Sequence, residues 1–289
     1  MLTIVGFIVV LAMVFGGYVV AGGKFGVIIK ALPAEMMMIG GAGIGSYLVA
    51  NSAGVLKASG GAVGRAFFGC KWSNKDYVDM LCLMFALIRI VKTKGVIALE
   101  AHIDNPKESD IFKNYPKILK DHFAVDFICD TFRMMSMNLD NPHQVEDMME
   151  KVLDKHHHEA LRPANALATL GEAFPALGIV AAVLGIIKTM SAVTEPPEIL
   201  GKMIAGALTG TFLGIFISYG FVSPMACKVR ETIDVDHHFY LIIRDILVAF
   251  LHGNAPQVAV EIGRGNVPSH LQPNFAALEA ALENAPKPA

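Results

Sequence analysis

Four apolar stretches, each long enough to cross a lipid bilayer, constrain the fold of this chain more than any other feature. They are Leu2 to Ala21, Met36 to Ala50 with its flanks, Ala173 to Met190, and Met203 to Met225. A transmembrane helix needs about 20 mostly apolar residues, and a spanning segment must satisfy its own backbone hydrogen bonds in lipid. We therefore predict an all-α integral membrane protein with four transmembrane helices.

Composition agrees with this prediction. Hydrophobic residues make up 54% of the 289 residues, charged residues make up 17%, and the mean hydropathy is +0.50. A soluble protein would carry about 25% charged residues. The first stretch follows Met1 directly, without the basic segment and cleavage site of a secretory signal, so we expect it to be retained. The net charge of −2 argues against a nucleic-acid partner.

The distribution of basic residues predicts the topology. Lys and Arg number 15 in residues 54–165 and 5 in the tail after the fourth stretch, against 4 in or beside the two short connections. Because positive residues stay on the cytoplasmic side, we expect both termini, the long middle segment and the tail to be cytoplasmic. The predicted division is 1–53 for spans one and two, 54–165 for a cytoplasmic domain, 166–226 for spans three and four, and 227–289 for a C-terminal helix and tail.

Helical periodicity runs through the middle segment, which indicates a folded helical domain. Apolar residues recur at helical spacing in three groups: Val78, Leu81, Phe85 and Ile88; Leu119, Phe123 and Phe127; Val145, Met148, Met149 and Val152. Asn141 followed by Pro142 is typical of a helix start, with Asn as the cap. Residues 284–289, rich in Ala and Pro, are expected to be disordered.

Glycines and prolines mark the predicted spans. Gly206, Gly210 and Gly214 lie on one face of the fourth, which lets another helix approach closely, within one subunit or between subunits. Pro175 and Pro224 lie near the cytoplasmic ends of the third and fourth. Each removes one intrahelical hydrogen bond, so they indicate either a hinge or hydrated vestibule, or simply the helix ends.

The central parts of the predicted spans contain no Asp, Glu or Arg, with Glu35 assigned to a short connection, Gly22 to Glu35. Proteins that move ions through membranes carry ionisable residues there. If this chain handles protons or Na⁺, we expect the binding carboxylate to come from another polypeptide.

Other site chemistries find little support. Consecutive histidines at 156–158 and 237–238 point in different directions on a helix and share ligands poorly, so we predict solvated helix ends and no metal site. The sequence has no nucleophile–base motif, phosphate loop or dinucleotide fingerprint, and we predict neither enzymatic activity nor a cofactor.

Five separated segments resemble, in order and spacing, the MotA family of flagellar-motor stator subunits. They are MLTIVGFIVVLAMVFGGYVVAGG at the start, Gly40 to Ser46, EAHIDNPKESDIFKNYP from Glu100, FPALGIVAAVLG from Phe174, and GTFLGIFISYGFVSP from Gly210. The resemblance runs from residue 1 to about 275. It implies a protein of the bacterial inner membrane in which proton flow drives flagellar rotation.

The resemblance also implies partners. Family members form a ring, expected here to be a pentamer, around two copies of MotB, which supplies a membrane Asp and a peptidoglycan anchor. Their cytoplasmic helices push on the rotor protein FliG. Pro175 and Pro224 match the two prolines needed for torque, and Glu100 matches an acidic rotor-facing residue. Lys92 stands where an arginine is common, so the charge is kept but the two-pronged geometry is lost.

Two positions bear on the coupling ion. Sodium-driven members tend to carry threonines in both the third and fourth spans, and Na⁺ prefers several oxygen ligands. Here the positions hold Ala182 and Thr211, so one hydroxyl is missing and we expect H⁺ as the coupling ion.

Two alternatives remain at this stage. ExbB/TolQ-like proton-channel scaffolds, which energise outer-membrane processes, also surround a partner with a membrane Asp, but they normally have three spans. A self-contained transporter would need an ionisable residue at mid-membrane or broken helices in related repeats, and neither is evident.

Overall fold

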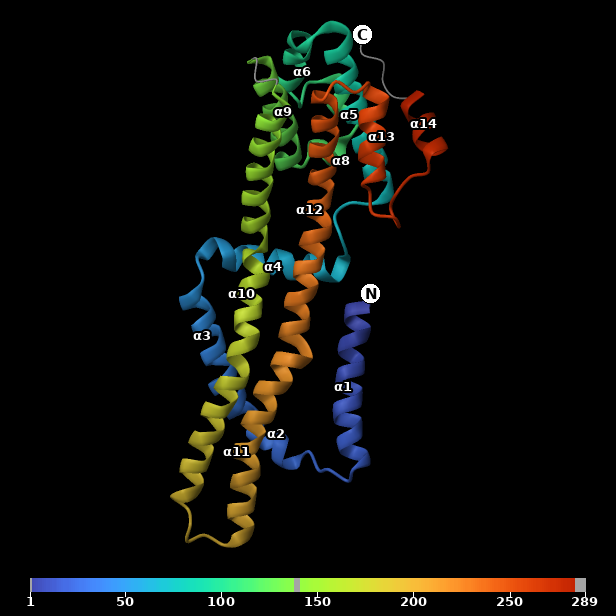
Figure 1. The fold of residues 1–289 in the computed structure, drawn as a ribbon. Helices are drawn as coiled ribbons and strands as arrows, with labels where there is room; N and C mark the ends of the chain where they lie inside the picture. Colours follow the sequence, from blue (N-terminus) through green and yellow to red (C-terminus); the bar gives the residue numbers. More distant parts are fainter. Residues whose placement is uncertain (1, 138–140, 284–289) are drawn as a thin grey trace. The chain divides into compact units, whose positions relative to one another are not determined.

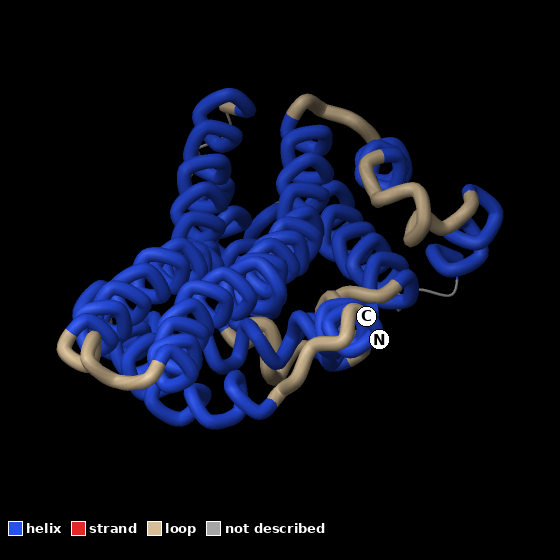
Figure 2. The backbone as a smooth tube through the Cα atoms, turned by 90° about the horizontal axis from the view of Figure 1, so that it is seen from below, coloured by secondary structure: helices blue, strands red, loops and turns tan. Residues whose placement is uncertain are grey.

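The computed structural model describes residues 2–137 and 141–283, and all regular structure in these residues is helical (Figures 1 and 2). The chain folds into two compact units. One comprises the chain up to Gly69 together with Ala160–Ile233, and the other comprises Cys70–Glu159 and the chain from Asp234 onward. We call the first the membrane unit and the second the helical unit.

Four helical segments of the described residues are long and apolar enough to cross a membrane, as predicted. They are Leu2–Val20, Gly26–Ala50, Pro142–Met190 and Pro197–Leu251. The second comprises α2 (Gly26–Glu35), a π-helical turn (Met36–Gly40) and α3 (Gly41–Ala50).

In the membrane unit, α1 is Leu2–Val20, α4 is Ala53–Phe68 and α11 is Pro197–Ile217. A π-helical turn, Ser218–Val222, joins α11 to α12 (Ser223–Leu251). The long helix α10 (Pro142–Met190) belongs to this unit from Ala160 onward. Figure 1 shows α10 and α11 side by side, connected by a short loop. Small and aliphatic residues of α4, including Ala62 and Ala66, pack against α10 and α12.

Helix α1 has no buried residue and contacts its neighbours mainly through aromatic rings. Phe15 lies 5.3 Å from Phe216 between ring centroids, and Phe7 lies 5.1 Å from Phe221. A side of α1 that contacts no protein in a single chain must face lipid or another subunit.

The helical unit is built around α5 (Asn74–Lys94), and every residue from Met80 to Ile88 is buried. The predicted positions Leu81, Phe85 and Ile88 are in the core, but α5 is apolar all round rather than on one face. A helix of this kind is enclosed on all sides. Helix α5 contacts α7 (Asp110–Lys113), α8 (Pro116–Leu119), α13 (Pro256–Gly265), α14 (Phe275–Glu283) and a 3-10 turn at Val96–Leu99. The unit also contains α6 (Glu100–Asp104) and α9 (His122–Ser136), which contact each other.

The start of α10 agrees with the sequence. Pro142 is its first residue, and the Asn141 side chain accepts a hydrogen bond from the His143 backbone N–H at 3.1 Å. Of the predicted apolar group, Val145 and Met149 are buried, whereas Met148 is 42% exposed. The stripe is therefore narrower than predicted. The segment 284–289, for which we predicted disorder, lies outside the described residues.

The expectation of solvated helix ends is wrong for most of the histidines. His156 and His157 lie within α10 and His237 within α12, and all three are half-buried. His156 stacks on Phe123 with ring centroids 3.5 Å apart, and His157 stacks on His237 at 4.1 Å. The flat imidazole rings of these histidines stack as aromatic side chains do. The consecutive spacing of the histidines in the sequence gives no sign of this stacking.

A buried carboxylate connects three parts of the helical unit. Asp121 caps α9 by accepting from the Ala124 N–H at 3.0 Å, accepts from the Tyr240 hydroxyl at 2.7 Å, and pairs with Lys71. Burial acts to raise the pKa of Asp121, but these three donors outweigh it and the pKa lies below its usual value of 3.8. Hydrogen bonds to the charged form stabilise it.

We expect Asp121→Asn to lower the free energy of unfolding of the helical unit by about 2–3 kcal/mol, because it removes charge-assisted hydrogen bonds from a buried hub. Trp72, the single tryptophan, stacks on Phe239 in this unit and reports its unfolding by fluorescence. Asp126→Asn, at an exposed position of the same helix, is the matched control.

The pH dependence gives a second readout of the same variant. A carboxyl whose folded pKa is depressed contributes its full stability above the unfolded value of 3.8 and loses it as pH falls further. The wild type should therefore lose stability below pH 3.8 more steeply than Asp121→Asn. If the free energy of unfolding fell equally steeply with pH in the wild type and in Asp121→Asn, the stabilising role of the ionised Asp121 would be contradicted.

Candidate functional site

The centre of the membrane unit is a seam of small residues where α10 and α11 nearly touch. A methyl group added at Gly214 of α11 would lie 2.5 Å from the Phe174 carbonyl oxygen and 2.9 Å from Gly178 Cα. Further along, one added at Gly185 of α10 would lie 2.6 Å from Ala207 Cβ. Helices associate in membranes by such close packing, which larger side chains prevent.

The predicted glycine face of the fourth span divides into two parts. Gly210 and Gly214 are buried, and an added Cβ at either would lie 2.5 Å from a neighbouring atom. A Cβ added at Gly206 would meet no atom of another described helix within 4 Å. Two of the three glycines thus pack closely within one chain, and the space beside Gly206 is open to water, lipid or another subunit.

Pro175 lies inside α10, and its lack of an N–H leaves the Gly171 carbonyl, four residues earlier, without its helical donor. The Ser218 hydroxyl supplies the missing hydrogen bond, donating to the Gly171 oxygen at 2.6 Å from the π-helical turn that follows α11. Ser218 is 1% exposed. The freed carbonyl is therefore satisfied by a side chain of a neighbouring helix.

Pro224 has a different position. It is the second residue of α12, directly after the π-helical turn Ser218–Val222, and its side chain is exposed. Because the helical backbone runs without a break from Pro197 to Leu251, Pro224 lies inside a helix, and its missing N–H removes one hydrogen bond at this junction. Both prolines therefore adjoin the same turn, Pro175 through the Ser218 hydrogen bond and Pro224 through the chain.

The two positions expected to select the ion lie on the paired helices. Ala182 of α10 is 7% exposed, and Thr211 of α11 is half-buried. Their sequence neighbours, Ala181 and Gly210, are in contact, because an added Cβ at Gly210 would lie 3.2 Å from Ala181 Cβ. Ala182 and Thr211 therefore lie at the same level along the paired helices α10 and α11.

The structure adds one residue that the sequence did not reveal as part of a span. Glu35 is the tenth residue of the 25-residue segment Gly26–Ala50, not part of a connection. The expectation that the spans contain no central carboxylate is therefore wrong. It failed because Lys30 and Pro33 interrupt the apolar pattern, whereas α2 continues through both, with Lys30 exposed and Pro33 inside the helix. A span of full length counted back from Ala50 would have included Glu35.

Lys92 and Glu100, the expected rotor contacts, belong to the helical unit. Lys92 is in the last turn of α5, and Glu100 is the first residue of α6. Both are exposed, and neither makes an ion pair with another described residue. Their charges remain available to a partner.

Family models match most of the chain. Residues 4–95 match the model described as motility protein A N-terminal, and residues 120–239 match that of the MotA/TolQ/ExbB proton channel family. Motility protein A of Salmonella typhimurium is 40% identical over 279 residues, which cover 96% of this chain and 94% of that protein. Chemotaxis protein LafT of Vibrio parahaemolyticus is 34% identical, covering 96% of both chains.

Two solved structures share the fold. MotAB of C. jejuni aligns with a TM-score of 0.71 at 18% identity, covering 92% of this chain and 95% of that one. The flagellar MotAB stator complex of Bacillus subtilis aligns with a TM-score of 0.66 at 20% identity, covering 90% and 92%.

We expect Ser218→Ala to lower the stability of the membrane unit by about 1–3 kcal/mol, because it leaves the buried Gly171 carbonyl without a donor. The measurement is the loss of monodisperse detergent-solubilised protein on heating. Ser191→Ala, which removes an exposed hydrogen bond to the Lys188 carbonyl in the loop before α11, is the control. Equal melting of the two variants would show that Ser218 is not needed to satisfy Gly171.

Proposed function

The chain belongs to the motility protein A family, and on that premise we propose that it is the stator subunit of a bacterial flagellar motor, converting proton flow into torque. The observation that carries this proposal is the identity to motility protein A across nearly the whole chain. The ExbB/TolQ-like alternative fits less well, because that identity extends over all four candidate spans.

The proposal includes an assembly. Five copies surround two copies of a MotB-like partner in the inner membrane, and both termini and the helical unit face the cytoplasm. The basic residues support this topology, since only four of the 24 Lys and Arg lie in or beside the two short connections. The relatives whose structures are solved as MotAB complexes support the partner. The lipid-facing or unpartnered surfaces of α1 and the open space beside Gly206 leave room for neighbouring subunits.

The proposed coupling ion is H⁺. Ala182 contributes a buried methyl group where a hydroxyl would be needed to complete a set of oxygen ligands, and a dehydrated Na⁺ is poorly held with fewer ligands. A proton needs only one acceptor, which the partner's Asp provides in this proposal. The driving energy is about 2.3 kcal/mol per proton for each 100 mV.

In cells whose motility depends on this chain, swimming speed should follow the proton gradient and should not change with external Na⁺. The expected result is loss of swimming on addition of a protonophore, at constant Na⁺, and unchanged speed when Na⁺ is replaced by K⁺. Ala182→Thr restores the missing hydroxyl and tests whether Na⁺ dependence appears. A steep Na⁺ dependence of the wild type would refute proton coupling.

The proposed contact with the rotor uses Lys92 and Glu100. Both charges are solvent-exposed, and exposed ion pairs contribute only about 0–1 kcal/mol each. Torque transfer through such pairs therefore depends on several weak contacts, and no single one is expected to be indispensable.

We expect Glu100→Lys to reduce swimming speed partly and to be rescued by a charge reversal on FliG. Glu108→Lys, an exposed change of the same kind eight residues away, is the control and should swim normally. If no reversal on the rotor restores the speed of Glu100→Lys, direct contact is excluded.

A further inference from the structure

Glu35 is a buried acid that the proposed mechanism does not yet use. Its residue is only 5% exposed, and its Oε2 atom is inaccessible and has no hydrogen-bond partner among the described residues. An ionised carboxylate without donors in an apolar setting costs several kcal/mol. The stable state of this group is therefore the protonated acid, unless a cation or a donor reaches it.

The carboxyl group packs on bare backbone. A Cβ built on Gly210 would lie 2.5 Å from Glu35 Oε2 and 3.2 Å from its Cδ, so the carboxyl group lies directly against the Gly210 backbone. Ala181 is the other neighbour of that point. Because Ala182 and Thr211 follow these two residues in sequence, Glu35 lies at the level of the positions expected to select the ion.

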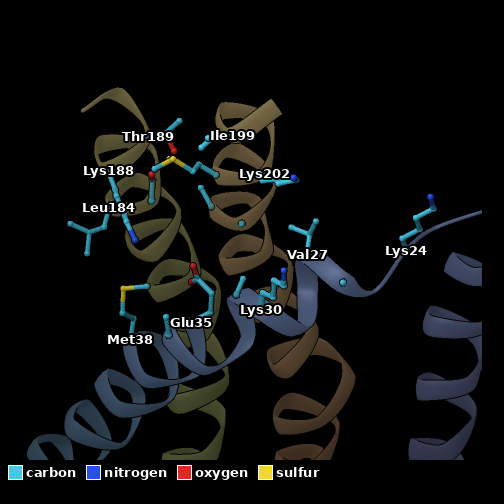
Figure 3. Close-up of a pocket in the computed structure, with 17 residues that line it drawn as sticks. Lys24, Val27, Lys30, Glu35, Met38, Leu184, Lys188, Thr189, Ile199 and Lys202 are labelled. Carbon is cyan, nitrogen blue, oxygen red and sulfur yellow. Dashed lines mark hydrogen bonds between the residues drawn. The ribbon is translucent and has the colours of Figure 1, made fainter. Parts of the chain in front are cut away.

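A cavity of about 830 Å³ extends from Glu35 toward the end of the membrane unit that carries both short connections. Figure 3 shows the Glu35 side chain reaching into the space between α10 and α11, with Lys24 and Lys202 extending away from it. The lysines that line the cavity are Lys24, Lys30, Lys188 and Lys202. None of these lysines forms an ion pair with Glu35 in the described structure. Lys202 pairs with Glu198 instead, with 3.9 Å between Lys202 Nζ and Glu198 Oε1.

The local helix geometry is also unusual. Pro33 precedes Glu35 by two residues, and a π-helical turn, Met36–Gly40, follows it immediately. Such turns occur frequently at functional sites. Here the turn joins the two α-helical parts of one candidate span and begins directly after Glu35.

We propose that Glu35 is a proton-carrying site of this subunit itself, between the lysine-lined cavity and the α10–α11 level of the ion path. The neutral acid gives its proton to the next acceptor inward, the partner's carboxylate, and becomes a carboxylate. The carboxylate then takes a proton from hydronium in the cavity, which leaves water, and returns to the neutral acid. This inference rests on the proposed stator function.

The first test compares three variants in motile cells. Glu35→Gln has nearly the same shape but cannot exchange a proton through a carboxyl group, and it should reduce stator-dependent proton influx on the order of tenfold or more. Glu35→Asp keeps the acid and should retain most of the influx. Glu172→Gln, at an exposed position of α10, is the control. Membrane content and co-purification with the MotB-like partner confirm that each variant assembles.

The second test separates proton carriage from packing. As the external pH is raised, the Glu35→Asp motor should lose speed at a lower pH than the wild type, because aspartate has a pKa about 0.4 below that of glutamate. A purely structural role would leave this pH profile unmoved. Infrared difference spectra of the purified complex should also show a protonated-carboxyl band that titrates with pH and is absent from Glu35→Gln.

The outcomes distinguish this inference from the proposed function. If the wild type neither rotates flagella nor conducts protons with its partner, the proposed function fails. If the wild type does both, and Glu35→Gln matches its influx or retains the infrared band, or Glu35→Asp leaves the pH profile unchanged, Glu35 carries no protons and only the further inference is overturned.

Discussion

The membrane unit depends on the close approach of α10 and α11, which only residues without bulky side chains allow. Lipid tails are as apolar as leucine, so helices gain little by hiding apolar surface from lipid and associate through backbone-level packing instead. Gly178 and Gly214 supply that packing, with Phe174 directly beside them. The seam thereby fixes the level at which Pro175, Ala182 and Thr211 lie, and the bare backbone at Gly210 accommodates the Glu35 carboxyl.

Satisfaction of backbone polar groups explains the arrangement around the prolines. Inside a membrane a freed carbonyl must find a donor, because no bulk water is available. Gly171 finds one in Ser218, and the Gly171 backbone leaves so little space that an added Cβ would lie 2.6 Å from Ser223 Oγ. The proline of one helix and the π-helical turn of the next are therefore interdependent. A displacement of that turn would break or move the hydrogen bond at Gly171, which gives this junction a physical means of coupling two helices.

The sequence was sufficient for the four spans, the helical class and the start of α10, because length, hydropathy and capping are local signals. It was less informative where tertiary packing decides. The periodicity of α5 predicted one buried face, but the helix is enclosed on all sides. The glycine spacing predicted one face without indicating that Gly206 would face open space. Neither the partner of the Gly171 carbonyl nor the stacking of His157 on His237 has a sequence signal, since their members are 47 and 80 positions apart.

Glu35 shows why the missed residue matters for ion selection. Its Oε2 atom lies against the Gly210 backbone, close to the Ala181 methyl group, and the position proposed to select the ion is another alanine, Ala182. A sodium ion in this place would lack the several oxygen ligands that compensate for its lost hydration. A proton needs none of them, because it forms a covalent O–H bond and removes the charge whose burial is costly. In the proposed proton-driven motor, the scarcity of oxygen ligands that favours the neutral acid at Glu35 and the missing hydroxyl at Ala182 would both disfavour Na⁺ for one physical reason.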